Sequence, residues 1–178
     1  MLISCEENVI DYKDTVLVDE VTYTKIDMEK VSGKVKGWHD NGELMVEETY
    51  KDGKLEGVHK QWHENGELRK EVNYQDGKPI GLVREWYKNG QLSFEYTYKN
   101  GALDGLYRHW YKKGQLKVEE IYKDGEKNGE SKQWYKDGQL SIEATYKDGK
   151  RDSLYREWGK KGRLKEKKEF KDSIEQLD

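Results

Sequence analysis

The sequence is short of the apolar residues from which a thick globular core is built. Only 33% of its 178 residues are hydrophobic, while 39% are charged, so an ordinary two-layer domain fits poorly. Aromatic residues are nevertheless plentiful, at 12% with 6 Trp and 13 Tyr, and disordered chains usually lack them. The composition therefore favours a thin fold in which each unit packs only on its neighbours.

Several other features are scarce. The single cysteine, Cys5, rules out an intrachain disulfide, and no apolar run is long enough to cross a bilayer as a helix. Lys and Glu are mixed along the chain and the net charge is −3, so there is no basic field to attract phosphates. We therefore expect no nucleic-acid partner.

Every tryptophan occupies the same position of a 24-residue period, which is the strongest pattern in the sequence. The tryptophans are Trp38, Trp62, Trp86, Trp110, Trp134 and Trp158. Leucine recurs with this spacing from Leu44 to Leu164, and an aromatic residue recurs from Tyr50 to Phe170. Glycines mark two turns in each period, as at Gly114 and Gly125. The pattern predicts six repeats, each with two turns.

Each repeat reads as a β-hairpin, because two short segments rich in aromatic and β-branched residues are bounded by glycine. In the fourth repeat these segments are residues 105–111 and 115–122. Pairs such as Asn89-Gly90 and Asp137-Gly138 are typical of two-residue type I′ turns. A helix is excluded, since a glycine every dozen residues would cost about 1 kcal/mol each in a helix interior.

A two-residue turn at each Asn-Gly position predicts the strand register. Arg108 then lies opposite Glu119, and equivalent positions place opposite charges together in five of the six hairpins. The other four pairs are Lys36 with Glu47, Lys60 with Glu71, Arg84 with Glu95 and Lys132 with Glu143, and only Arg156 with Lys167 departs from the rule. The tryptophan then shares a face with the ion pair, and Leu116, Val118, Tyr122, Tyr107 and Tyr111 share the other face.

The predicted fold is all-β: an elongated, twisted, single-layer antiparallel meander of six 24-residue hairpins in residues 33–172. Residues 1–32 are expected to provide a polar tether, at 6–15, and strands at 16–18 and 21–23 that cover the N-terminal sheet edge. Residues 173–178 are expected to form a C-terminal tail. The lysine-rich last repeat is typical of an edge protected against strand addition.

The repeat resembles the MORN-variant repeat of YwqK-type bacterial proteins. The third repeat carries the resemblance in Asp76-Gly77-Lys78, Gly81, Trp86-Tyr87, Asn89-Gly90, Leu92, Glu95 and Tyr98. The resemblance implies a β-hairpin array used as a binding module, in a family whose members include antitoxin-like or immunity-like proteins and others exported to the cell surface. The departures are Glu29, Ser131 and Gly159, which put the terminal repeats in doubt as binding surface.

No motif of catalysis or metal binding is evident. There is no Gly-x-Ser-x-Gly elbow, no phosphate-binding glycine loop and no cysteine pair. His59 and His63 lie about 13 Å apart along one strand, and His39 and His63 about 10 Å apart across strands, too far for one zinc ion. The periodic carboxylates read as structural. We therefore predict a non-enzymatic protein without catalytic, metal or cofactor sites.

Aromatic side chains are the candidates for partner contact, because Trp and Tyr dominate binding hot spots. The tryptophans are expected to form the ladder-like core of the thin fold. The candidate contact residues either follow a tryptophan or differ between repeats: Tyr87, Phe94, Tyr96, Tyr107, His109, Tyr111 and Tyr135. We expect a monomer that binds a protein, such as a cognate toxin or a surface protein. The alternative is an adaptor for the phospholipid surface, which paired lysines and arginines disfavour.

The run Leu2-Ile3-Ser4-Cys5 resembles a bacterial lipobox, which predicts lipidation of Cys5. In this interpretation the sequence begins partway through a precursor, because no basic or apolar signal region precedes Cys5. The mature protein would then sit in the cell envelope as a lipoprotein, with membrane contact only through its lipid anchor. The other interpretation is an ordinary cytoplasmic start with an unmodified cysteine. We expect the first.

Overall fold

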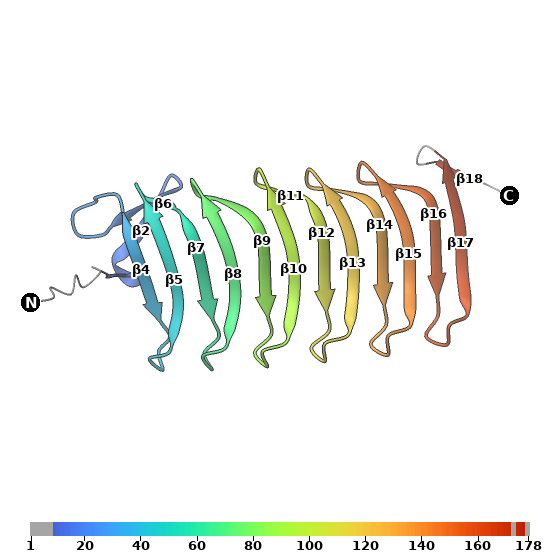
Figure 1. Cartoon of the computed structure of the whole chain (residues 1–178), viewed down its shortest axis with the longest axis horizontal. Helices are drawn as coiled ribbons and strands as arrows, with labels where there is room; N and C mark the ends of the chain where they lie inside the picture. The colour runs from blue at the N-terminus through green and yellow to red at the C-terminus, as the bar shows by residue number, and fades with distance from the viewer. Residues whose placement is uncertain (1–8, 172–173, 177–178) are drawn as a thin grey trace, which may run out of the picture. The chain divides into compact units, whose positions relative to one another are not determined.

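The computed structural model of the chain describes residues 9–171 and 174–176, with side chains as far as residue 170. The chain forms two compact units, Met1–Ile80 (unit 1) and Gly81–Asp178 (unit 2). The boundary falls inside one strand, β9 (Lys78–Trp86). Each unit consists of successive β-hairpins in chain order (Figure 1).

Unit 1 contains eight strands and one short 3-10 helix among its described residues. They are β1 (Val9–Asp11), η1 (Tyr12–Asp14), β2 (Thr15–Val18), β3 (Val21–Thr24), β4 (Gly33–Trp38), β5 (Leu44–Lys51), β6 (Lys54–Leu55), β7 (Gly57–Trp62) and β8 (Leu68–Gln75). The sheet order is β1-β4-β5-β7-β8, with β6 paired to β5.

The N-terminal residues differ from the prediction in two ways. The strands expected at 16–18 and 21–23 form, as β2 and β3, but they make a separate two-stranded sheet. The edge of β4 is instead covered by β1, in parallel, within the stretch expected to be a tether. Val9 and Ile10 explain the difference, since apolar residues of this kind favour a strand over a polar linker.

Unit 2 continues the hairpins from β9. Its further strands are β10 (Leu92–Lys99), β11 (Ala102–Leu103), β12 (Gly105–Trp110), β13 (Leu116–Lys123), β14 (Glu126–Trp134), β15 (Leu140–Lys147), β16 (Lys150–Trp158), β17 (Leu164–Lys171) and β18 (Ile174–Gln176). Every strand pairs antiparallel with its neighbour, and β11 pairs with β10. The expected C-terminal tail therefore contributes a strand, β18, paired with β17. The fold is the all-β hairpin meander that the periodicity predicts.

The type I′ turns lie at the other glycine of each repeat from the one predicted. Asp124 and Gly125 both have positive φ, at 50° and 89°, which is the type I′ conformation. At Tyr111–Gly114 only the glycine has positive φ. There the Gly114 N–H donates to the Tyr111 carbonyl, and the Tyr111 N–H to the Gln115 carbonyl, both at 2.8 Å. This is a three-residue loop that ends in a glycine bulge.

The predicted register is nevertheless correct, because a second irregularity offsets the longer loop. Trp110 lies opposite Leu116, but His109 lies opposite Val118, so Lys117 is an extra residue in β13. This β-bulge restores the pairing of Arg108 with Glu119. It also moves Leu116 onto the face that carries Trp110, so the prediction that Leu116 shares the face of Val118 is wrong.

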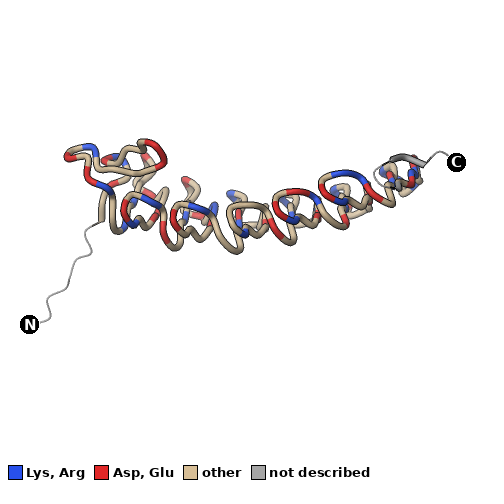
Figure 2. Tube along the Cα trace, turned by 90° about the horizontal axis from the view of Figure 1, so that it is seen from above, with Lys and Arg blue, Asp and Glu red and all other residues tan. Residues whose placement is uncertain are grey.

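The five predicted ion pairs all form, on the face that carries the tryptophans, which we call the outer face. Their N–O distances are 2.9 Å for Lys36–Glu47, 3.2 Å for Lys60–Glu71, 3.0 Å for Arg84–Glu95, 2.8 Å for Arg108–Glu119 and 4.0 Å for Lys132–Glu143. Arg156 lies opposite Lys167 and pairs instead with Glu143, at 3.3 Å. Figure 2 accordingly shows both signs of charge interleaved along each unit.

Much of the core lies on the opposite face, the inner face, as one column of residues in directly opposed pairs, while Val31 and Val46 are buried outside this column. The column in unit 1 is Val35, Glu48, His59 and Val72, and in unit 2 it is Val83, Tyr96, Tyr107, Glu120, Ser131, Ala144, Tyr155 and Lys168. Val35 and Val83 are completely buried. No tryptophan is buried and Trp38 is 47% exposed, so the tryptophans are not the core that they were expected to be.

Candidate functional site

Four of the predicted contact residues come together on the inner face of unit 2. Phe94 and Tyr96 lie on β10, and Tyr107 and His109 lie on β12. Phe94 is directly opposite His109. Residues two apart in a strand share a face, so all four side chains point the same way.

These rings form a continuous cluster. Phe94 stacks on His109, with ring centroids 4.1 Å apart and planes at 18°. Tyr96 stacks on Tyr107 at 5.8 Å and 29°, and Phe94 lies 6.2 Å from Tyr107. Offset-stacked and tilted pairs at these distances are favourable for aromatic quadrupoles. The cluster is therefore preorganised by its own ring contacts.

Two more tyrosines extend the cluster at its edges. Tyr98 contacts Tyr96 edge-on at 5.8 Å, and Tyr122 contacts Tyr107 edge-on at 5.8 Å. Each lies opposite a glycine on one neighbouring strand, Gly81 for Tyr98 and Gly105 for Tyr122, and opposite Leu103 or Lys127 on the other. The aromatic cluster, as we name it, thus consists of six half-buried rings: Phe94, Tyr96, Tyr98, Tyr107, His109 and Tyr122.

Two of the tyrosine hydroxyls in the cluster donate hydrogen bonds to carboxylates. The Tyr96 hydroxyl donates to Glu85 Oε1 at 2.7 Å, and the Tyr122 hydroxyl to Glu120 Oε2 at 2.9 Å. The buried Glu120 is also bound by Lys127 Nζ, at 2.5 Å, and by the Ser131 hydroxyl, at 3.1 Å. These bonds fix the orientation of the rings.

The pKa shifts of four cluster residues favour their uncharged forms. Desolvation by burial, reinforced by bonds to Glu85 and Glu120, raises the pKa values of Tyr96 and Tyr122. Burial also raises the pKa of Tyr107. For His109, burial and then the charge of Lys117 lower the pKa. These rings are therefore uncharged near neutral pH.

The three tyrosines that follow tryptophans have a different role. The hydroxyls of Tyr87, Tyr111 and Tyr135 donate to the backbone carbonyl of the tryptophan in the next repeat, at 2.6, 2.9 and 2.8 Å. In unit 1, His39 Nε2 lies 3.0 Å from the Trp62 carbonyl in the equivalent position. These side chains join successive repeats, and Tyr87 also supports the cluster, because its hydroxyl lies 3.3 Å from His109 Nε2.

The tryptophans occupy equivalent positions within each unit. Each lies opposite a leucine next to the β-bulge, as Trp110 does opposite Leu116 and Trp134 opposite Leu140. The backbone carbonyls of Trp62, Trp110, Trp134 and Trp158 are bonded by side chains of the preceding repeat, and the tryptophan rings are part of the outer face. The tryptophan position thus marks the joint between repeats.

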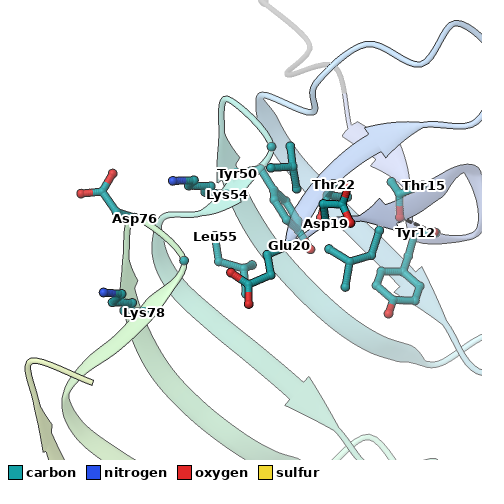
Figure 3. A pocket seen from close by; sticks show the side chains of 14 residues that line it. Tyr12, Thr15, Asp19, Glu20, Thr22, Tyr50, Lys54, Leu55, Asp76 and Lys78 are labelled. Atoms are coloured by element: carbon teal, nitrogen blue, oxygen red, sulfur yellow. Dashed lines mark hydrogen bonds between the residues drawn. The ribbon is translucent and has the colours of Figure 1, made fainter. Parts of the chain in front are cut away.

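Unit 1 contains a pocket of about 780 Å³ beside the β2–β3 hairpin (Figure 3). Asp19 and Glu20, from the turn of the hairpin, line the pocket and lie between Tyr12 on one side and Lys78 on the other in Figure 3. Its wall includes Leu17, Val21, Tyr50 and Leu55. Its size is typical of a small-ligand or side-chain pocket.

The repeat geometry agrees with a comparison of the sequence with known families. The MORN repeat variant matches at five tandem segments, residues 32–52, 55–76, 79–100, 103–124 and 127–148. The chain belongs to the MORN repeat variant family. The sixth hairpin, β16–β17, lies outside these matches but has the same register, with Trp158 opposite Leu164. No curated protein matches the chain.

Membership of the MORN repeat variant family makes the chain a repeat scaffold of the type that binds proteins or membranes. Among residues 9–171 and 174–176, no helix is long and apolar enough to span a bilayer. No three His, Cys, Asp or Glu side chains gather in that part of the chain as a metal site would require. Cys5, the predicted lipidation site, lies outside the described residues.

Sequence reasoning missed Tyr98 and Tyr122 as members of the aromatic cluster. Both belong to the periodic aromatic position, which reads as structural because it recurs in every repeat. Tyr98 and Tyr122 differ from their equivalents in the residues beside them. Tyr96 and Tyr107 occupy column positions that Val72 and Val83 occupy in the preceding repeats. An aromatic residue in both the periodic and the variable position was the available signal.

Proposed function

We propose that this protein is a non-enzymatic scaffold that binds a protein partner through the aromatic cluster. The observation that supports the proposal is the set of six contiguous, half-buried, uncharged rings on adjoining strands of unit 2. Tyrosine and phenylalanine at such a surface bury a large area with little loss of conformational freedom.

The family resemblance suggests the class of partner. It is a toxin that the chain neutralises or, failing that, a protein of the cell surface. A phospholipid surface is less well suited, because the repeated lysines and arginines of the outer face pair with glutamates, which weakens their attraction to anionic headgroups.

The test uses the proteins encoded beside the gene, each purified and titrated against the full chain by calorimetry. The double variant Phe94→Ala/Tyr107→Ala should weaken the affinity for a true partner by about 100-fold or more, because central aromatic anchors contribute about 2 kcal/mol or more each. The matched control is Leu106→Ala/Ile121→Ala, which truncates two exposed side chains on β12 and β13 on the outer face.

The proposal predicts that the control binds as the unmodified chain does. Equal loss in both double variants, with unchanged melting temperatures, would place the contact elsewhere. Flotation of the chain with anionic vesicles, unaffected by Phe94→Ala/Tyr107→Ala, would favour the membrane adaptor instead.

A further inference from the structure

The β2–β3 hairpin of unit 1 presents an open strand edge. Val18 and Val21 flank the two-residue turn, and Leu17 lies opposite Thr22. In an antiparallel pair, alternate residues direct their N–H and C=O groups away from the partner strand. Thr22 does so, because its N–H donates to the Gly53 carbonyl at 2.7 Å and its carbonyl accepts from the Val31 N–H at 3.0 Å.

The same alternation points the N–H and C=O of Leu17 away from β3, on the other edge of the hairpin. Within residues 9–171 and 174–176, β2 pairs only with β3. The Leu17 side chain is 68% exposed and Val18 is 41% exposed. An uncovered edge with apolar side chains is a template for an added strand.

The pocket lies on the side of the hairpin where such a strand would place its side chains. Leu17 is in the pocket wall together with Thr15 and Val21. A residue opposite Leu17 in an added strand has its side chain on the same face as Leu17. That side chain would therefore meet the apolar wall formed by Tyr12, Leu17 and Leu55.

The charge of the residues around the β2 edge indicates the charge that a bound strand should carry. Residues 9–29 contain six Asp or Glu and two Lys, a formal net charge of −4, and one of the lysines, Lys13, pairs with Asp11 at 2.9 Å. Asp19 and Glu20, at the end of β2, line the pocket together with Asp76, Lys54 and Lys78. Complementary charge favours a basic strand and disfavours pairing with a second acidic hairpin.

We propose that β2 binds an extended basic peptide segment of a partner protein by strand addition, with an apolar side chain of that segment in the pocket of unit 1. This interaction uses backbone hydrogen bonds at Leu17 for affinity and the pocket for selectivity. It is a separate site from the aromatic cluster and does not depend on the function proposed for that cluster.

The probe is a fluorescent, end-capped heptapeptide, Lys-Val-Lys-Val-Lys-Val-Lys, titrated into the full chain by anisotropy. Two versions carry three backbone N-methyl groups each, either on the valines or on the last three lysines. In an antiparallel added strand with a valine opposite Leu17, methylation of the valines removes the N–H groups of the edge that faces β2, so binding should weaken by about tenfold or more. Methylation of the lysines affects the far edge and should leave most of the binding.

Two protein variants give the reciprocal test. Leu17→Pro removes the outward N–H and should weaken binding to the same degree as methylated valines, whereas Leu17→Ala keeps the backbone and should weaken it less. Hydrogen exchange of the Leu17 amide should slow when the unmethylated peptide binds. Because the methylated peptides test the unmodified chain, the result does not depend on the folding of Leu17→Pro.

Three results would overturn the proposal. They are equal affinity for the two methylated peptides, unchanged exchange at Leu17 under saturating peptide, and loss of peptide binding in Phe94→Ala/Tyr107→Ala. A concentration-dependent dimer that Leu17→Pro abolishes and the peptide fails to dissociate would assign the edge to a second copy of the chain instead.

Discussion

Units 1 and 2 share one hairpin register but differ in what fills the inner column. In unit 1 the column is narrow, with Val35 and Val72 beside the buried Glu48 and His59. In unit 2 the corresponding positions include the larger side chains of Tyr96 and Tyr107, which belong to the aromatic cluster. The difference shows that turns and bulges set the strand pairing, while the residues of the column vary between units.

The largest expected effect concerns glycines at the same turn position in the two units. In unit 1, a Cβ on Gly53 would lie 2.4 Å from Val21 Cγ1 and 2.8 Å from the Thr22 carbonyl oxygen. In unit 2, a Cβ on Gly149 would have its nearest contact at 3.7 Å, with the Glu126 side chain. Both residues have positive φ, at 78° and 75°, so both substitutions carry backbone strain.

Gly53→Ala should therefore destabilise the chain by on the order of 3 kcal/mol, from strain and overpacking, and Gly149→Ala by about 1 kcal/mol, from strain alone. Urea denaturation of the two variants measures the difference. Equal destabilisation would mean that the β2–β3 hairpin does not pack on the Asp52-Gly53 turn.

A second prediction concerns the buried His59 of unit 1. Glu48 Oε1 lies 3.2 Å from Nδ1 of His59, which is within ion-pair range. Neither ring nitrogen, however, makes a hydrogen bond among the described residues. Burial, and then the charge of Lys70, lower the pKa of His59 from 6.5 to about 4. The unfolded chain therefore takes up this proton first as the pH falls, so the histidine destabilises the fold between pH 6.5 and about 4.

His59→Val, which copies Val35 and Val83, should remove this penalty. The variant should gain about 2 kcal/mol relative to the unmodified chain between pH 7.5 and pH 5. Burial also raises the pKa of Glu48, which has an effect of opposite sign in the unmodified chain. Parallel pH dependence of their urea midpoints would contradict the prediction.

The smallest effect concerns the tyrosines that join repeats in unit 2. Tyr111→Phe removes the bond from the hydroxyl to the Trp134 carbonyl, at 2.9 Å, and should cost about 1 kcal/mol. The matched control is Tyr146→Phe, where Lys127 Nζ lies over the ring, 5.2 Å from its centroid, and it should cost under about 0.5 kcal/mol. Thermal denaturation compares them. Equal costs would show that the hydroxyl of Tyr111 does not join repeats.

Much of the fold follows from the sequence, because the 24-residue period and the paired charges each constrain the strand register. The turn type could not be read correctly, since asparagine before glycine serves a purpose other than positive φ. The Asn89 side-chain amide donates to the Lys112 carbonyl in the next repeat, at 3.0 Å, and its Oδ1 accepts from the Gln91 N–H, at 3.3 Å.

The candidate site was only half predictable for a related reason. Variation between repeats identified Phe94, Tyr96, Tyr107 and His109, which do lie together. It could not separate them from Tyr111 and Tyr135, because contacts between residues 23 apart are invisible when a single hairpin is considered. The bulge at Lys117 places Leu116 on the outer face. No local feature of the sequence indicates such a bulge, so the face of Leu116 and its equivalents could not be predicted.

The offset between the three-residue loop and the strand bulge limits how this chain can change in length. Losing one residue from the loop, or from the bulge at Lys117, would turn the inner side chains of a strand outward and expose its column. Losing one residue from each would leave the faces intact. A single insertion or deletion therefore disturbs a strand unless it occurs in such a pair, whereas a complete 24-residue repeat can be added or removed without disturbing the others.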